Sequence, residues 1–246
     1  MNNIKFDHIS VLYENKKGNI VTAVDDISFS IQPNTFNIII GPSGSGKSTL
    51  LKCLTGELVS EGKIYFGDKD LEDIPIKDRK ISYMSQDYIV YPSVNVYDNI
   101  AFPLKIMKVD REEMDQIIKD IAHKLDIDLL LTRKCKYLSI GQISRVALAK
   151  ALVKNSDLYI FDEPVKNLDI KNQRKVNDLI KKQLKEAGNT VIYVTHDINE
   201  VMYLADYIYV LKSSKSIEKY TPEELLKSTD NEVLDLLKPQ EYEEEN

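Results

Sequence analysis

One short segment of the 246-residue chain combines glycines, a lysine and hydroxyl groups in a pattern suited to holding phosphates. It matches the pattern G-x-x-x-x-G-K-S/T and, with the residue after it, runs Gly41, Pro42, Ser43, Gly44, Ser45, Gly46, Lys47, Ser48, Thr49. Glycines let the backbone curl tightly, so that its N–H groups point at phosphate oxygens. Lys47 would bring positive charge to the β- and γ-phosphates, and the Ser48 hydroxyl suits Mg²⁺. An apolar run precedes the segment and a helical run follows it, which predicts a phosphate-binding loop at a helix N-terminus.

Two adjacent carboxylates, Asp162 and Glu163, follow another apolar run at residues 158–161. Ligands of open α/β sheets bind beyond the carboxyl ends of the strands, which is where such a pair would lie. Asp162 would orient Mg²⁺, directly or through water, and Glu163 would polarise a water aimed at the γ-phosphate. Taken alone, an Asp-Glu pair is commonly only an acidic turn or helix start. The phosphate-binding loop elsewhere in the chain is what gives the pair this chemistry.

The loop by itself leaves GTPases, small-molecule kinases and ATPases open. The chain has no N-K-x-D motif, which weakens the guanine-nucleotide alternative, and no recognisable acceptor site for a small-molecule kinase. Lys and Arg together number 33 and Asp and Glu 39, which gives a net charge of −6. Because generic binding to a nucleic-acid backbone needs a basic surface, no nucleic-acid partner is expected.

Apolar patterning predicts that the elements positioning these groups form an α/β fold. Short apolar runs predict strands at residues 4–11, 21–31, 36–40, 81–84, 158–161, 191–194 and 207–211. Helical patterns lie between several of these runs, which is typical of a mainly parallel sheet covered by helices.

The stretch from about residue 87 to residue 137 has a different character. A helix start at Asp110 is followed by apolar residues on one helical face, including Met114 and Ile118. This pattern predicts a helical insertion into the α/β body. Near the end of the chain, a single helix is expected from Thr221 to about Leu237, with proline at its first position.

The two cysteines, Cys53 and Cys135, are far apart and form no CxxC pair. Neither a zinc site nor a disulfide is expected, which fits a reducing compartment. No run reaches 18 apolar residues, and the first residues lack the apolar core of a signal peptide. The sequence therefore predicts a cytosolic protein that could still dock on a membrane protein.

Residues 138–142 read Leu-Ser-Ile-Gly-Gln and resemble the LSGGQ signature of the ATP-binding-cassette (ABC) ATPases, with Ile140 in place of the first glycine. Four further features occur in the order of that family. They resemble its adenine-stacking aromatic, its Q-loop glutamine, its D-loop and its switch histidine, and they are Tyr13, Gln86, Asn167-Leu168-Asp169 and His196. Each feature is weak alone, and the ordered set is specific.

The resemblance implies a P-loop NTPase fold of the ABC cassette type, with a mainly parallel sheet, an N-terminal antiparallel β subdomain and a helical insertion. It implies a single ABC ATPase domain over residues 1–238. The α/β core would comprise residues 1–86 and 138–220, the helical subdomain 87–137 and the C-terminal helix 221–238. Residues 239–246 would be an acidic tail.

The resemblance also implies how ATP and Mg²⁺ are held. ATP would lie between the phosphate-binding loop of one cassette and the signature of a second, where Ser139, Gly141 and the helix starting near Gln142 meet the γ-phosphate. Tyr13 would stack on adenine. Lys47, Gln86 and His196 would stabilise transition-state charge while Glu163 orients water. The implied ligands of Mg²⁺ are Ser48, Gln86 and Asp162.

The implied partners are a second ABC ATPase domain, identical or not, and separate integral membrane permease subunits. These subunits would hold the chain at the inner face of the cell membrane, and residues 88–91 would either meet them or pack inside the helical insertion. Residues 95–104, 163–169 and 193–197 look most like importer cassettes, whereas residues 19–25 also resemble exporter and cell-division cassettes. A soluble ABC ATPase acting on ribosomes or DNA is the other alternative, and the transported substrate stays open.

Ile140 is the clear departure from the signature. A β-branched residue takes a positive φ only at a cost of about 1–3 kcal/mol, so the loop is expected to differ or to be strained. The side chain would also crowd the partner's nucleotide and slow closure, in which case Ile140→Gly would raise turnover of the assembled transporter. The alternative is a harmless substitution.

Overall fold

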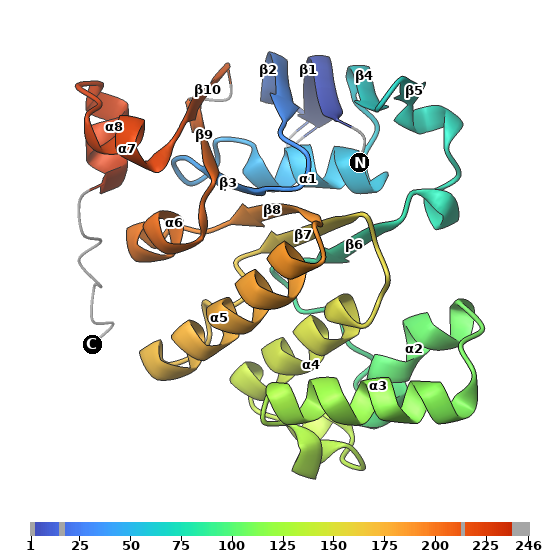
Figure 1. Cartoon of the computed structure of the whole chain (residues 1–246). Helices are drawn as coiled ribbons and strands as arrows, with labels where there is room; N and C mark the ends of the chain where they lie inside the picture. Colours follow the sequence, from blue (N-terminus) through green and yellow to red (C-terminus); the bar gives the residue numbers. More distant parts are fainter. Residues whose placement is uncertain (1–2, 15–17, 213–214, 238–246) are drawn as a thin grey trace. The chain divides into compact units, whose positions relative to one another are not determined.

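The computed structural model describes residues 3–14, 18–212 and 215–237, and these divide into two compact units (Figure 1). The first unit comprises residues 1–79 and 188–246, and the second comprises residues 80–187. The expected acidic tail, residues 239–246, lies outside the described residues, as does residue 238.

The first unit contains an antiparallel sheet and a second, mainly parallel group of strands. Its strands are β1 (Ile4–Glu14), β2 (Ile20–Ile31), β3 (Phe36–Ile40), β4 (Glu61–Phe66), β5 (Lys69–Asp70), β8 (Thr190–Val194), β9 (Tyr207–Lys212) and β10 (Ser216–Tyr220). The antiparallel sheet has the order β2-β1-β4-β5. β3 pairs in parallel with β8 on one side and β9 on the other, and β10 pairs antiparallel with β9. All five residues of β3 are buried, which explains its continuous apolar run.

The helices of the first unit are α1 (Lys47–Thr55), α6 (Ile198–Leu204), α7 (Pro222–Leu226) and α8 (Asn231–Leu237), with single 3₁₀ turns at Leu71–Asp73 and Ile76–Asp78. The antiparallel β subdomain expected at the N-terminus is thus confirmed, and β1 and β2 extend beyond the predicted ranges. In the described residues, no helix combines the length and apolar character needed to cross a membrane.

The C-terminal segment forms two short helices, α7 and α8, so the prediction of a single helix was wrong. α7 begins at a capping box formed by Thr221 and Glu224, with Pro222 in its first turn. Asp230 then accepts hydrogen bonds from two N–H groups at the start of α8, and its carboxylate also pairs with the Lys212 amine at 2.6 Å. Because this pairing fixes Asp230 as a new helix start, the chain turns before it instead of continuing one helix.

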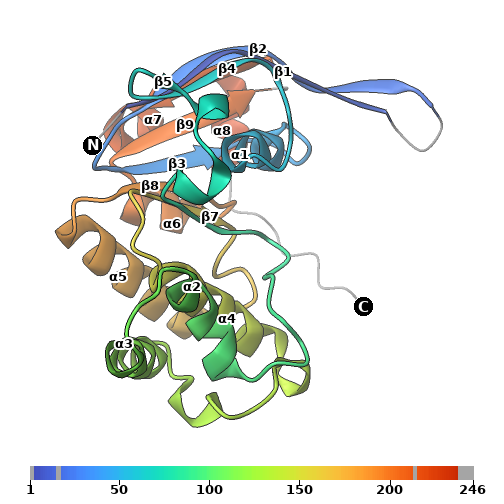
Figure 2. The same ribbon diagram turned by 90° about the vertical axis from the view of Figure 1, so that its right-hand side faces the viewer.

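The second unit carries two parallel strands and four helices. They are β6 (Ile81–Met84), β7 (Leu158–Asp162), α2 (Val96–Ile106), α3 (Arg111–Lys124), α4 (Ile140–Leu152) and α5 (Ile170–Glu186), with 3₁₀ turns at Asp128–Leu130 and Cys135–Tyr137. Figures 1 and 2 both show α2, α3 and α4 packed side by side. α3 buries Met114 and Ile118, as its pattern predicted, and Asp110 caps its N-terminus. Cys53 of the first unit and Cys135 of the second are both buried free thiols.

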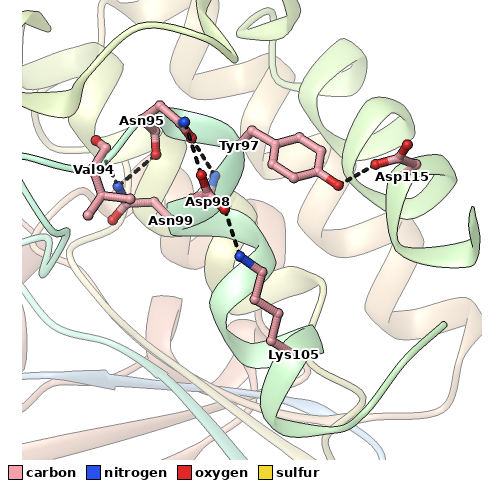
Figure 3. Close-up of polar contacts among 7 residues, drawn as sticks. All are labelled: Val94, Asn95, Tyr97, Asp98, Asn99, Lys105 and Asp115. Atoms are coloured by element: carbon pink, nitrogen blue, oxygen red, sulfur yellow. Dashed lines mark hydrogen bonds and ion pairs between the residues drawn. The ribbon is translucent and has the colours of Figure 1, made fainter. Parts of the chain in front are cut away.

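Asn99 of α2 holds together the turn that leads into this helix (Figure 3). Its side chain is fully buried, and its Oδ1 accepts the N–H of Tyr91 at 2.7 Å. Its Nδ2 lies 2.9–3.3 Å from the carbonyl oxygens of Tyr91, Val94 and Asn95. One buried amide therefore satisfies several backbone groups of a segment that has no regular structure of its own.

A second contact in Figure 3 joins α2 to α3. The Tyr97 hydroxyl donates a hydrogen bond to the Asp115 carboxylate, and this bond raises the pKa of Tyr97 to about 12. Asp98 on the neighbouring side of α2 pairs with the Lys105 amine at 2.6 Å, and both side chains are substantially exposed. Of these contacts, the buried ones are expected to contribute most to the stability of the helical segment.

We predict that Asn99→Ala lowers the free energy of unfolding by about 2–4 kcal/mol, because it leaves buried backbone groups unpaired. Urea denaturation would measure the loss. Lys105→Ala is the control, since it removes only an exposed ion pair and should cost about 0–1 kcal/mol. Equal losses in the two variants would contradict the importance of Asn99.

Candidate functional site

The phosphate-binding loop of the first unit connects β3 to α1, as its sequence predicts. Pro42, Ser43 and Gly44 are exposed at the tip of the loop, whereas Ser45 is buried. Lys47 is buried as the first residue of α1, and its amine donates to the carbonyl oxygens of Gly41 and Pro42, both at 2.8 Å. The lysine therefore folds back over its own loop.

The start of α1 is suited to an anion. Gly46 at the N-cap has no side chain to cap the helix, and the first turn, which includes half-buried Ser48 and Thr49, carries no acidic residue. The N–H groups at a helix start attract negative charge because they have no partner within the helix. Gly46 itself has a φ of 99°, and a Cβ there would lie 2.5 Å from the carbonyl oxygen of Ala23. Glycine is thus required both by backbone conformation and by space.

Two other predicted residues lie in the same unit. Tyr13 of β1 is 36% exposed, and its hydroxyl is 3.4 Å from the Oγ1 of Thr49, so the hydroxyl end of the ring lies next to α1. His196 is half-buried and follows β8. Because β8 and β3 are parallel neighbours, the loop holding His196 and the phosphate-binding loop leave the same end of these strands.

In the second unit, the structure brings Gln86 and Glu163 together. They follow β6 and β7, which are parallel neighbours, so both residues leave the same end of the pair. The Nε2 of Gln86 donates to the Oε2 of Glu163 at 3.3 Å. Asp162 and Glu163 are both buried, at 3% and 7% exposure, and Glu163 has a φ of 51°. A left-handed backbone in a residue other than glycine costs free energy, and such residues are concentrated at functional sites.

Tyr88 is a supporting residue whose position sequence reasoning left undecided. Its hydroxyl donates to the backbone oxygen of Glu163 at 3.0 Å and accepts from the Nδ2 of Asn167 at 3.1 Å. Burial raises the pKa of the Tyr88 hydroxyl, so it stays protonated and able to donate. Ile89 and Tyr91, by contrast, are 62% and 42% exposed. Nothing in the sequence separates Tyr88 from Tyr91, because both are tyrosines in one irregular segment.

The signature segment forms the start of α4. The Ser139 Oγ accepts the N–H of Gln142 at 3.3 Å, and the Gln142 Oε1 accepts the N–H of Ser139 at 3.0 Å, which is a complete capping box. A Cβ on Gly141 would lie 3.0 Å from the carbonyl oxygen of Asn167. The backbone of the segment after Glu163 approaches position 141 so closely that a side chain there would be crowded, and glycine avoids this contact.

Ile140 is the first residue of α4 and does not take a positive φ, so of the two expected outcomes the segment differs in conformation and is not strained. Ser139 rather than Ile140 makes the change from extended to helical backbone, because it is the N-cap, and α4 begins two residues earlier than expected. The Ile140 side chain is 61% exposed. Any residue with ordinary helical propensity fits such a position without backbone strain.

Ser144 of α4 is a buried polar residue with a hydrogen-bond partner. Its hydroxyl donates to the carbonyl oxygen of Pro164 at 2.8 Å, which ties α4 to the turn that follows Glu163. The polar character of this position within an otherwise apolar helix face is the signal that could have identified it.

The comparison with protein families now decides the identity of the fold. Residues 24–166, which contain the phosphate-binding loop, the signature and both carboxylates, match the family model described as ABC transporter. This chain belongs to the ABC transporter family. The cassette-type α/β fold expected from the resemblance is confirmed.

Curated relatives of this ABC cassette include ATP-binding proteins of importers. The trehalose/maltose import ATP-binding protein of Thermococcus litoralis is 42% identical over 212 residues, which are 83% of this chain and 57% of the relative. The molybdate/tungstate import ATP-binding protein of Thermococcus kodakarensis is 36% identical over 194 residues, 78% of this chain and 59% of the relative. The chain spans less than two thirds of the length of these relatives.

A solved structure resembles the cassette over nearly its whole length. It is a dimeric structure of MJ0796, described as a bacterial ABC transporter cassette, with a TM-score of 0.81 and 29% identity. The match covers 89% of this chain and 98% of that one. A second structure of MJ0796, described as a post-hydrolysis state bound to ADP and Pi, matches with the same TM-score and 28% identity.

We predict that Ile140→Gly relieves no strain and instead lowers the free energy of unfolding by about 0.5–1 kcal/mol, because glycine loses more backbone entropy in a helix. Ile170→Gly is a matched control, since Ile170 is the exposed first residue of α5 behind the N-cap Asp169. Urea denaturation of both variants would test this. A stability gain confined to Ile140→Gly would show that the signature is strained after all.

Proposed function

We propose that the chain is the ATP-binding and hydrolysing subunit of an ABC importer, in which ATP-driven closure of two cassettes is coupled to transport by separate membrane subunits. The observation that carries the proposal is the buried Glu163 carboxylate contacted by Gln86, in a family member whose phosphate-binding loop is intact. The names of the relatives favour import, and the substrates in those names include sugars and oxyanions. The substrate itself would be set by the membrane subunits.

ATP is the nucleotide that the first unit fits. The uncapped start of α1 and the exposed loop tip suit the triphosphate. The Lys47 amine, which contacts two carbonyl oxygens of the loop, would contact phosphate oxygens in their place. Tyr13 offers an exposed aromatic face beside α1 for the adenine. We assign His196 to stabilising charge at the γ-phosphate.

Mg²⁺ is consistent with the donors available. The Ser48 hydroxyl, the Gln86 amide and the Asp162 carboxylate are hard oxygen donors, which Mg²⁺ prefers. Within residues 3–14, 18–212 and 215–237, no three His, Cys, Asp or Glu side chains gather as a metal-binding group. This agrees with an ion held by few protein ligands together with nucleotide phosphates. When bound, Mg²⁺ would neutralise charge on the phosphate oxygens.

Glu163 would be the group that accepts a proton from the attacking water. The water oxygen forms a bond to the γ-phosphorus while the bond from that phosphorus to the β–γ bridging oxygen breaks. The electron pair leaves with ADP, and the water proton passes to Glu163 and then to phosphate or solvent. Lys47, Gln86 and His196 would stabilise the negative charge that spreads over the phosphate oxygens.

We further propose that residues 1–238 act as one ABC ATPase domain, with residues 87–137 as its helical subdomain. A second cassette would complete the site, with its Ser139, Gly141 and Gln142 at the γ-phosphate. The dimeric MJ0796 cassette supports this arrangement. The first turn of α4 carries no acidic residue, which suits a helix start that meets an anion.

The permease subunits would dock on an exposed surface of the second unit formed by Ile89, Tyr91 and Phe102. The rings of Tyr91 and Phe102 are 5.2 Å apart, and the Lys150 amine lies 4.7 Å from the centre of the Tyr91 ring. Burial lowers the pKa of Lys150, and its amine also lies 3.4 Å from the Ile89 carbonyl oxygen. An apolar surface with a cation at its edge suits an amphipathic helix of a membrane subunit, which would place the cassette at the inner face of the membrane.

Glu163→Gln tests the proposed function. The amide should retain ATP binding but slow hydrolysis, so that ATP holds two cassettes together. Light scattering with saturating ATP and Mg²⁺ should show a dimer for this variant and a monomer for Glu163→Gln combined with Lys47→Ala, which lacks the phosphate-binding amine. A Glu163→Gln chain that binds ATP and stays monomeric would contradict the shared site.

Tyr13→Ala tests the adenine contact. Loss of the ring should weaken ATP binding by about 1–3 kcal/mol, the usual contribution of base–aromatic stacking. Titration calorimetry would measure it. Tyr13→Phe is the control, because it keeps the ring and removes only the hydroxyl near Thr49. Unchanged affinity in Tyr13→Ala would mean that the ring does not meet the base.

A further inference from the structure

Lys166, in the turn after β7, reaches back to the carboxylate of Glu163. Its Nζ lies 2.5 Å from the Oε2 of Glu163, and this is the same oxygen that accepts from Gln86. The Glu163 side chain is 8% exposed and the Lys166 side chain 54% exposed. The lysine therefore brings a positive charge from the surface onto a buried carboxylate that the mechanism assigns to proton transfer.

This contact opposes the chemistry proposed for Glu163. The attacking water must meet a carboxylate oxygen of Glu163, and an ammonium bound to one of these oxygens competes with water for that position. Charge–charge interactions of buried groups are screened less by solvent than those at the surface. The ion pair at this position therefore occupies one carboxylate oxygen and holds the Glu163 side chain toward Lys166.

The ion pair is built by the local turn and needs no second chain. The N–H of Lys166 lies 3.4 Å from the carbonyl oxygen of Glu163, which the Tyr88 hydroxyl also contacts. The next residue, Asn167, bonds to Tyr88 through its side chain, and its backbone lies against Gly141 of the signature. A shift of residues 166–168 would therefore move the lysine relative to the carboxylate. It would also change the contact between Asn167 and Gly141 at the start of α4.

We propose that Lys166 is a positioning residue that restrains Glu163 in the resting cassette, and that movement of residues 166–168 releases the carboxylate for hydrolysis. This inference rests on the proposed function, because it assigns a control to the same carboxylate. The lysine touches the catalytic side chain and is not itself a catalytic residue.

The kinetic test compares Lys166→Met with Lys166→Arg in the full chain. Met keeps the length of the side chain and removes the charge, so kcat for ATP should rise about threefold to tenfold while KM changes less than about twofold. Arg keeps the charge and should retain the rate of the unaltered chain. Lys175→Met is the matched control, since Lys175 forms another 2.5 Å ion pair in this unit, with Asp126, and both partners are half-exposed.

An unchanged or lower kcat in Lys166→Met would overturn the restraint. A raised KM with unchanged kcat would overturn it as well, because Lys166 would then serve nucleotide binding. A rise shared equally by Lys166→Arg would show that the charge is irrelevant and would have the same consequence.

Amine labelling tests the ion pair without relying on ATP hydrolysis. Brief acetylation followed by peptide mass spectrometry should modify Lys166 at least about threefold faster in Glu163→Gln than in the unaltered chain, because an amine in contact with a carboxylate oxygen is less accessible to the reagent. Lys175 provides the internal reference, as its partner is unchanged. Equal labelling of Lys166 in the two chains would overturn the proposal even if the unaltered chain hydrolyses ATP. Faster labelling in Glu163→Gln, together with an unaltered chain that does not hydrolyse ATP, would support the ion pair and contradict the proposed function.

Discussion

A buried carboxylate must be paired, and this requirement organises the second unit around Glu163. Gln86 and Lys166 meet its side chain, and Tyr88 meets its backbone oxygen. These contacts come from the segment after β6 and from the turn after β7, which the parallel pairing of the two strands brings to the same end. The geometry of the carboxylate thus depends on sheet pairing first and on individual hydrogen bonds second.

The contacts extend from this carboxylate to the signature. Asn167 bonds to Tyr88 and lies against Gly141, while Ser144 bonds to the turn through Pro164. α4 is therefore fixed to the segment that carries Glu163 by backbone approach and by a buried hydroxyl. Since interiors are closely packed, a displacement of one of these segments cannot leave the other unchanged. The signature and the carboxylate are mechanically linked within one unit.

In the first unit the polar groups that need partners are the buried Lys47 amine and the start of α1. The Lys47 amine is buried, and its own loop supplies two carbonyl oxygens as partners. The N-terminus of α1 keeps its positive character because Gly46 adds no capping side chain. The loop therefore pairs the buried cation through its own backbone and leaves the start of α1 without a capping side chain.

The sequence by itself determined the chemistry-bearing residues and most of the elements that hold them. The phosphate-binding loop, the two carboxylates Asp162 and Glu163 and the strand ranges of β3 and β6 follow from local pattern, because glycine conformation, apolar periodicity and capping act over a few residues. The roles expected for Tyr13, Gln86 and His196 depended in addition on the resemblance to the motif order of the ABC family.

Only the tertiary structure decided what depends on contacts between distant segments. It placed Tyr88 inside and Tyr91 outside, gave Gly141 its neighbour, and showed that Ile140 sits in an ordinary helical position. It divided the C-terminal segment in two at Asp230, whose partner Lys212 lies on β9. Such choices are made by packing and by the need to pair buried polar groups, and neither is encoded in any short stretch of sequence.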